Sequence, residues 1–438
     1  MSERRAYPKS VQAGIPKLGP KPRGWSTYTL GDLLTVVERP ILLEPQERYQ
    51  LVTAKRNRGG IIERGQLKGR SIKTKTQFVA KSGDFLISRR QIAHGACGIV
   101  PASLDNAVVS NEYVTLQPTQ LLNINFLKHL TNTIYFQQTC FHSSIGVHVE
   151  KLVFNLEHWM TWQFHLPPLH VQRRIAAVLD EWDEAIARAE TLAGAKRQQR
   201  DWLTDELTRT NNRQAMSELA HIVFSTVDKK TAPDEIKVRI CNYLHVLGNR
   251  ALTDDLRFDT GSATAQEIER FGLQLGDVVF TKDSETAEEI AEVSVVMEQL
   301  ENVVCGYHLA VARPLEGIAL GRYVAHALRN PSVRNEFVTR VNGAVRFGLT
   351  METMDQIEIP LPSLETQLRV ADILDTADSE ITSLLRYIDQ LRLQKRSLVQ
   401  KLLTGDWPVP ASIDRLLSGG QDIEHAVGVE EQRAEATG

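Results

Sequence analysis

The chain has 438 residues, of which 42% are hydrophobic and 24% are charged, and its formal net charge is -3. These proportions are typical of globular proteins and exclude wholesale disorder, and the length predicts two or three domains. No run of about 18 apolar residues occurs, which excludes a membrane-spanning helix. Because no apolar segment follows the charged start, we expect a cytoplasmic protein without a membrane partner.

The cysteines and histidines are spread along the chain without the spacing of a metal site. No Cys-x-x-Cys pair occurs, which favours reduced, buried thiols over a disulfide framework or a zinc site. We therefore predict no bound metal. The cysteines are Cys97, Cys140, Cys241 and Cys305.

Residues 1–24 are expected to form an N-terminal segment, and residues 25–164 a first globular head. The stretch 55–90 within this head contains eleven basic and two acidic residues, so it carries +9 while the rest of the chain carries -12. A local positive face can bind phosphates whatever the total charge, although a basic loop can also serve solubility alone. The basic residues are Lys55, Arg56, Arg58, Arg64, Lys68, Arg70, Lys73, Lys75, Lys81, Arg89 and Arg90.

An internal repeat organises the chain. His165–Thr208 aligns without a gap with Pro360–Leu403, at an offset of 195, and fourteen positions are identical. Chance does not produce this similarity, so we interpret the chain as a tandem duplication. The repeated parts are predicted as two spacer helices, at 165–212 and 360–405.

Each spacer helix carries an apolar seam with the 3.5-residue period of a coiled coil, and two matching seams are expected to pair with each other. The prolines before each helix suit a helix start, and Ser363 is the expected N-cap of the second. A separate packing of each helix on its own head is the alternative. The seams are Ile175, Leu179, Trp182, Ile186, Ala189, Ala193, Lys196, Arg200, Leu203 and Leu207 in the first copy, and Val370, Leu374, Ala377, Ile381, Leu384, Ile388, Leu391, Lys395, Leu398 and Leu402 in the second.

The second globular head is predicted at 213–359. It resembles the first in pattern, because Gly83-Asp84 and Gly276-Asp277 each precede an apolar strand, and both heads close with a strand that leads into prolines. The fold class is therefore α/β (α+β), with two heads joined by two long antiparallel coiled-coil helices in a pseudo-twofold repeat. The tail 406–438 is expected to be partly disordered, beyond about residue 418.

Catalytic signatures are missing, and we predict no catalytic residues. Gly60–Gly65 has the glycine spacing of a phosphate loop, but Gln66-Leu67 replaces the Lys-Ser/Thr pair that holds phosphate and Mg²⁺. Asp234-Glu235-Ile236-Lys237 contains a Glu-x-Lys element, without room for the strand that separates it from an upstream carboxylate in a nuclease metal site.

The repeated motif Leu166-Pro167-Pro168-Leu169…Gln172…Arg174…Leu179-Asp180…Asp183, and its copy from Leu361 to Asp378, resembles the conserved regions of specificity subunits of type I restriction-modification enzymes. The second copy ends in Leu402-Leu403-Thr404-Gly405-Asp406-Trp407, similar to the end of that family's helix. The resemblance covers about residues 25–407. The heads resemble the family in pattern only.

The resemblance implies a non-catalytic subunit that recognises double-stranded DNA. Each head would be a target recognition domain for one half of an asymmetric bipartite site, and the helices would set the distance between the halves. Two modification subunits and the restriction subunits would be its partners. No cofactor is then expected on this chain, and S-adenosylmethionine, ATP and Mg²⁺ would belong to those partners.

Within this interpretation, the basic stretch supplies phosphate contacts, and Asn57 and Gln66 are candidates for contacts with adenine. The second head carries a net charge of -7, from 15 basic and 22 acidic residues at 213–359. DNA binding by this head therefore depends on a local positive face. The alternative is that its cations only pair with nearby acids. Its candidates are Lys229, Lys230, Lys237, Arg239, Asn249, Arg250, Lys282, Arg340 and Arg346.

Four polar positions of the helix repeat are identical in both copies and are expected to point outward, toward partner subunits. They are Gln172, Arg174, Asp180 and Asp183, with Gln367, Arg369, Asp375 and Asp378. Other interpretations stay open: a specificity subunit of a modification-only or rearranged system, a stand-alone endonuclease with an unrecognised site, and a coiled-coil adaptor that does not bind DNA.

Overall fold

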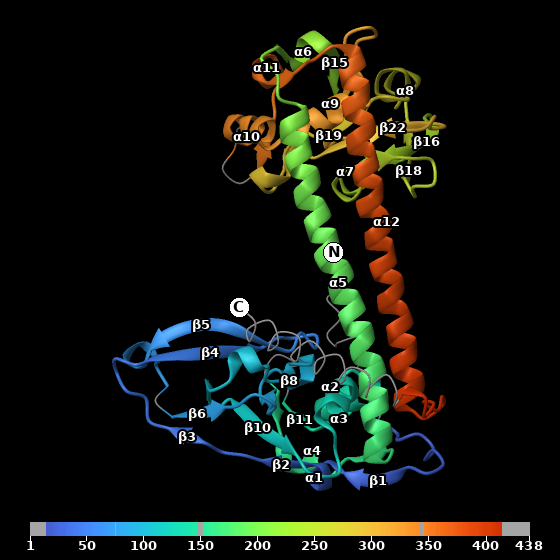
Figure 1. The fold of residues 1–438 in the computed structure, drawn as a ribbon. Helices are drawn as coiled ribbons and strands as arrows, with labels where there is room; N and C mark the ends of the chain where they lie inside the picture. Colours follow the sequence, from blue (N-terminus) through green and yellow to red (C-terminus); the bar gives the residue numbers. More distant parts are fainter. Residues whose placement is uncertain (1–14, 75, 147–151, 342, 344–345, 414–438) are drawn as a thin grey trace, which may run out of the picture. The chain divides into compact units, whose positions relative to one another are not determined.

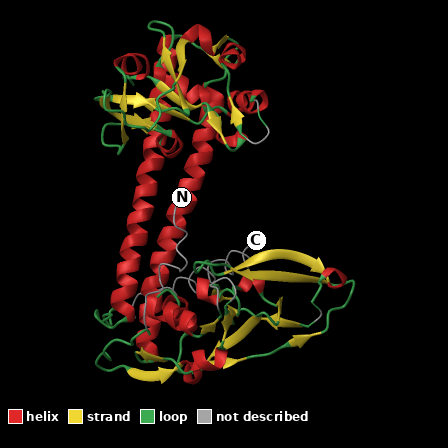
Figure 2. Cartoon of the chain, turned by 180° about the vertical axis from the view of Figure 1, so that it is seen from behind, coloured by secondary structure: helices red, strands yellow, loops and turns green. Residues whose placement is uncertain are grey.

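The computed structural model describes residues 15–74, 76–146, 152–341, 343 and 346–413. The chain has a mixed α/β fold and divides into two compact units, Met1–Arg188 with Ile388–Gly438, and Ala189–Tyr387. Each unit contains one head and parts of both long helices (Figures 1 and 2). The predicted tail beyond residue 413 and Lys75 lie outside the described residues.

The two long helices are α5 (Leu169–Leu207) and α12 (Leu364–Leu403). Helix α5 begins directly after Pro167-Pro168, where proline is tolerated because the first helical N–H groups have no partner in the helix. Helix α12 begins after Ser363, whose Oγ accepts a hydrogen bond from the N–H of Thr366 at 3.4 Å. The expected N-cap is therefore confirmed.

The predicted seams of both helices are buried or half-buried at every position. In the first unit, Ile175 and Leu179 share a core cluster with Val399 and Leu402. In the second unit, the other end of α5 packs on the start of α12, where Val370, Ala371 and Leu374 are buried. The residue numbers rise along one helix as they fall along the other, so the helices are antiparallel within each unit.

Among the described residues, the first head contains two main sheets, with strand orders β2-β10-β7-β8 and β3-β6-β9-β4-β5. The helices α2 (Ile124–Leu130) and α3 (Ile134–His142) cover the first sheet, and the rings of Phe85, Phe136 and Trp159 meet edge to face in its core. The strands are β2 (Leu34–Val36), β3 (Pro40–Ile41), β4 (Arg48–Ala54), β5 (Ile61–Lys68), β6 (Gln77–Ala80), β7 (Phe85–Ser88), β8 (Cys97–Ile99), β9 (Ala107–Ser110) and β10 (Tyr113–Pro118).

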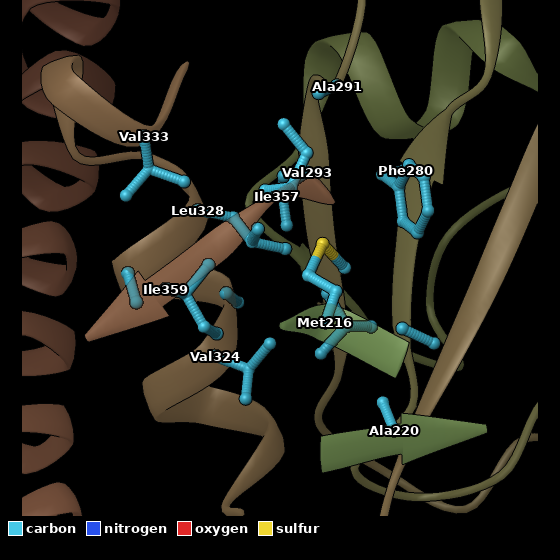
Figure 3. Packing of buried hydrophobic residues seen from close by; sticks show 14 of the residues in the cluster. Met216, Ala220, Phe280, Ala291, Val293, Val324, Leu328, Val333, Ile357 and Ile359 are labelled. Carbon is cyan, nitrogen blue, oxygen red and sulfur yellow. The ribbon is translucent and has the colours of Figure 1, made fainter. Parts of the chain in front are cut away.

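The second head also contains two main sheets, with strand orders β15-β23-β19-β21-β17 and β18-β16-β22. Figure 3 shows its main core, in which Phe280 and Val293 of the first sheet lie near Val324 and Leu328 of α9 (Gly321–Leu328). The strands are β15 (Ala220–Phe224), β16 (Ile236–Cys241), β17 (Ala251–Leu252), β18 (Asp259–Ala263), β19 (Val278–Thr281), β21 (Val293–Val296), β22 (Val303–Cys305) and β23 (Leu309–Pro314).

Shorter elements complete the two heads. Strand β1 (Ser26–Thr29) pairs with β13 (Gln163–Leu166), and β14 (Arg213–Ala215) pairs with β25 (Glu358–Pro360), so each head closes beside the helix that follows it. The remaining elements are α1 (Leu30–Leu33), β11 (Ser144–Ile145), β12 (Val153–Phe154), α4 (Leu156–Met160), α6 (Met216–Leu219), α7 (Tyr243–Gly248), α8 (Ala265–Phe271), β20 (Asp283–Ser284), α10 (Pro331–Arg340), β24 (Phe347–Gly348) and α11 (Met351–Gln356), with 3-10 turns at Gly69–Ser71, Ile92–His94, Ala102–Leu104 and Ala287–Glu289.

The Gly-Asp turns occupy the same place in both heads. Gly83 (φ 83°) and Gly276 (φ 87°) adopt the left-handed conformation that glycine tolerates best, and each leads into the central strand of a sheet. The following carboxylates are buried and bind an arginine, Asp84 at 2.7 Å from Arg39 and Asp277 at 2.8 Å from Arg313. This resemblance between the heads, predicted from sequence, is confirmed at the turns.

The four cysteines are free and buried, as expected. Burial raises the pKa of the Cys97 thiol to about 12, so this thiol stays protonated at neutral pH. Within the described residues, none of the helices combines the length and the apolarity needed to cross a bilayer.

Candidate nucleic-acid interface

Much of the basic stretch of the first head lies on the hairpin of β4 and β5 and on the segment that follows it (Figure 1). The hairpin turn is fixed by Asn57 (φ 57°) and Arg58 (φ 63°), whose N–H groups donate to the carbonyls of His94 and Gly95 at 2.8 and 3.1 Å. Beyond the turn, Arg64 and Gln66 are exposed on β5. The backbone of the hairpin turn is therefore held in place, and the strand beyond the turn exposes polar side chains.

Three of the predicted arginines in this head have partners within the chain. The Nε of Arg56 donates to Gln91 at 2.7 Å, Arg58 donates to the carbonyl of Asn132 at 3.0 Å, and Arg90 forms an ion pair with Glu112 at 2.6 Å. In the described part of the chain, the other predicted cations form no ion pair with a carboxylate, which leaves them available to phosphates. These are Lys55, Arg64, Lys68, Arg70, Lys73, Lys81 and Arg89.

The second head differs, because most of its predicted cations are already neutralised. Six of the eight predicted cations lie within 4.0 Å of a carboxylate oxygen, as the alternative of pairing with neighbouring acids predicts. The pairs are Lys229–Asp259 (2.7 Å), Lys230–Asp228 (3.7 Å), Arg239–Asp254 (2.6 Å), Arg250–Asp378 (3.2 Å), Arg340–Glu336 (3.6 Å) and Arg346–Asp283 (2.8 Å).

The remaining candidates of this head have different surroundings. The ammonium of Lys282 lies 4.6 Å from the ring centre of Tyr307 and donates to the carbonyl of Ser225 at 2.8 Å. Burial lowers the pKa of Lys282, and the nearby Asp283 opposes this change. Asn249 donates to the carbonyl of His245 at 2.8 Å and so caps the end of α7.

The face of β16 and β18 carries an open depression of about 660 Å³. Lys237 is exposed there on β16, beside Arg239, whose guanidinium is held by Asp254 and by the carbonyl of Glu301. The depression thus presents donors and acceptors together. It is lined by Thr231, Lys237, Val238, Arg239, Asp254, Thr260, Gly261, Glu301 and Asn302.

The prediction that Gln172 and Gln367 point outward is wrong, because both side chains are buried. Gln172 accepts from the N–H of Asn123 at 2.8 Å and donates to the carbonyls of Leu121 and Pro167, both at 2.9 Å. Gln367 makes the same three bonds, at 2.8, 3.0 and 2.9 Å, to Leu320, Ile318 and Pro362. The amide thus fastens each head to its own helix, and this explains the identity of the two positions.

Asp180 and Asp375 also bind their own heads. Each is half-buried and lies beside a buried histidine, Asp180 at 2.9 Å from His129 and Asp375 at 2.8 Å from His326. Burial tends to raise the pKa of Asp375, but the hydrogen bond from His326 and the charge of Arg322 outweigh it and lower the pKa. Intrachain contacts thus explain this identity too, without a partner subunit.

Asp183 and Asp378 bind basic side chains of the opposite helix. Lys395 forms an ion pair with Asp183, and Arg200 lies 3.8 Å from Asp378, although Asp378 also contacts Arg250 and Arg329. The remaining identical pair is less enclosed, since Arg174 is half-buried and Arg369 is exposed. The two histidines and the head loops lie outside the repeated motif, so their contacts with the repeated polar residues could not be predicted from the sequence.

Among the residues that the structure describes, one group of side chains has the composition of a metal site, namely His129, Asp180 and Asp183. Lys128 already lies 2.8 Å from Asp180 and 3.3 Å from Asp183. With Lys395 on Asp183 as well, protein cations balance both carboxylates. The cluster is therefore explained as a salt-bridge network between head and helices.

A family model described as "Type I restriction modification DNA specificity domain" matches residues 22–193 and 262–391, more than half of the chain. The chain belongs to this specificity-domain family. It is 28% identical over 140 residues to the putative type I restriction enzyme MjaX specificity subunit of Methanocaldococcus jannaschii. That match covers 32% of this chain and 33% of the relative, so the chain matches about a third of the relative's length.

Two solved structures extend the family comparison. The S subunit of a type I restriction-modification system from M. genitalium matches 89% of this chain and 99% of its own, with 12% identity and a TM-score of 0.55. A second solved chain, described as "Structural basis underlying complex assembly and conformational transition of the type I R-M system", matches 89% and 100%, with 16% identity and a TM-score of 0.55. At these identities the likeness establishes the shared fold of the specificity family.

Proposed function

We propose that the chain is the sequence-reading subunit of a type I restriction-modification complex and that each head reads one half of an asymmetric, bipartite DNA site. The observation that carries this proposal is that the two heads share one frame and differ in their exposed polar side chains. Asp84–Arg39 and Asp277–Arg313 stabilise the same turn in each head. Two readers of different half-sites need this combination of a common frame and variable surfaces.

The long helices would set the distance between the half-sites as an antiparallel coiled coil of two repeated units. The separation of half-sites is a geometric property of a protein that reads both, so a fixed spacer demands a rigid connection. The amide bonds of Gln172 and Gln367 support this role because they hold each head on its helix. Two modification subunits would dock on the helices, where Arg369 remains exposed, and restriction subunits would join them.

Catalysis would belong to these partners. S-adenosylmethionine, ATP and Mg²⁺ are accordingly proposed for the modification and restriction subunits, with no cofactor on this chain. The described residues with the composition of a metal site are already paired with lysines, which supports a structural role for them.

Mapping N6-methyladenine across the genome of the producing cell, with and without this chain, tests the proposal. We expect methylation to be lost at one motif of two defined halves around a fixed gap. The modification partners must be expressed equally in both cells, as quantitative proteomics would establish. Unchanged methylation with these partners present would overturn the proposed function.

A further inference from the structure

The residues that directly follow the central strands β7 and β19 occupy equivalent places in the two heads. Arg89 follows β7 and Lys282 follows β19. The N–H of Arg89 donates to the carbonyl of Glu112 at 2.8 Å, and that of Lys282 donates to the carbonyl of His308 at 3.1 Å. Their own carbonyls accept from the residues at the same place before α4 and α11, Phe154 at 3.2 Å and Leu349 at 2.8 Å. The backbone is therefore equivalent at this point.

In the first head this place carries a fixed arginine. The side chain of Arg90 is 69% exposed, and its Nε and Nη2 donate to the two carboxylate oxygens of Glu112 at 2.6 and 3.1 Å. A guanidinium has five N–H donors, so the edge formed by Nη1 and the second hydrogen of Nη2 is left over. This edge carries two parallel donors, which match O6 and N7 of guanine in the major groove.

In the second head the same place carries a different arrangement. Asp283 stands where the first head has Arg90, and it accepts from Nη2 of Arg346 at 2.8 Å and from Nδ1 of His308 at 2.6 Å. The side chain of Arg346 is 60% exposed while Asp283 is 18% exposed, so the carboxylate lies beneath the guanidinium.

The arginine and its carboxylate thus exchange places between the two heads, although the backbone is equivalent. In the first head the arginine follows the central strand, and its carboxylate precedes β10. In the second head the carboxylate follows the central strand, and the arginine precedes β24. Each head therefore offers an exposed arginine supported by a carboxylate, at a different point of an equivalent surface.

We propose that Arg90 and Arg346 each read a guanine in the half-site of their own head, with Glu112 and Asp283 as positioning residues. This inference rests on the proposed function and adds the residues that determine specificity. A guanidinium already held in one orientation loses little freedom on binding, which favours base reading over a mobile phosphate contact. A bidentate contact of this kind discriminates by about 10- to 100-fold against the wrong base.

The test uses the full chain co-expressed with its modification partners and a map of N6-methyladenine for each variant. R90Q is expected to relax the requirement for guanine at one position in one half of the motif and to leave the other half unchanged. R346Q is expected to do the reverse, so each half is the internal control for the other. R209Q is the matched control, because Arg209 is also exposed and paired with carboxylates, Asp205 and Glu206, but it follows the end of α5 and lies outside both heads. It should leave the motif unchanged.

The outcomes separate this inference from the function on which it rests. A wild-type map without a bipartite motif would overturn the proposed function. A bipartite wild-type motif that R90Q and R346Q leave unchanged would overturn the assignment of these arginines, as would an equal loss of methylation at every site, which indicates phosphate contacts. If R90Q unfolds in a thermal melt, R90K keeps the charge without the two-donor edge and should relax the same guanine.

Discussion

Lys395 of α12 forms an ion pair with Asp183 of α5, and this contact has a counterpart in the other repeat. Arg200 aligns with Lys395 and Asp378 aligns with Asp183, and these two side chains lie 3.8 Å apart. A polar position inside an apolar seam therefore meets the carboxylate of the opposite helix at both ends. Such a contact fixes the register of two helices more strictly than apolar packing does.

The register contact predicts a charge-swap rescue. D183K should weaken the first unit, because it places an ammonium group beside those of Lys395 and Lys128. The double variant D183K/K395D should recover part of the stability, since Lys128 remains next to position 183. For this partly exposed pair we expect a coupling energy of about 1 kcal/mol. A double-mutant cycle of urea unfolding measures this energy, and strictly additive effects would show that the two side chains do not interact.

The buried amide of Gln172 predicts a larger effect. Q172A leaves the N–H of Asn123 and the carbonyls of Leu121 and Pro167 without their partner, and unsatisfied buried groups cost about 1–3 kcal/mol. We expect a lower melting temperature for the first unit. R173A is a suitable comparison because Arg173 is exposed on the same helix of the same unit, and the inference would fail if both variants melted alike.

The helices could be predicted from the sequence because their signal is periodic and repeated. Every seam residue from Ile175 to Leu402 is buried or half-buried, as the 3.5-residue spacing indicates. The role of Gln172 could not be predicted, because its partners lie about fifty residues earlier in a loop without a pattern. Identity between the copies therefore suggests an outside partner, whereas at this position it reflects the docking of each head on its helix.

The candidate interface was predicted only in part for a similar reason. Density of charge locates the basic stretch at 55–90, because charge is a property of composition. It does not reveal which cations are neutralised, since Arg90 and Glu112 are 22 residues apart and meet through strand pairing. The ion pairs of the second head likewise depend on tertiary contacts, as that between Arg346 and Asp283 shows.

The histidine at the junction of α9 and α12 predicts acid sensitivity of the second unit. Burial lowers the pKa of His326 below its ordinary 6.5, and the hydrogen bond to Asp375 opposes this effect without cancelling it. The unfolded chain then binds this proton more readily, so the contribution is complete above about pH 6.5 and is lost as the pH falls toward the folded pKa. H326Q should reduce the fall of melting temperature between pH 7 and pH 5, and an identical pH profile in both proteins would contradict this account.

The unpaired cations of the first head predict a salt dependence that the second head does not share. Removing Lys68 and Lys73 together should weaken binding to all DNA sequences and reduce the slope of log K against log salt by about 0.9 for each phosphate that the variant no longer neutralises. The matched double variant K229A/K230A should change the slope little, because Asp259 and Asp228 already compensate these lysines at 2.7 and 3.7 Å. Titrations of the complex with its modification partners at several salt concentrations measure both slopes. Equal slopes for the two variants would mean that the lysines of the second head leave their carboxylates for phosphate, and that the acidic head binds the backbone as the basic head does.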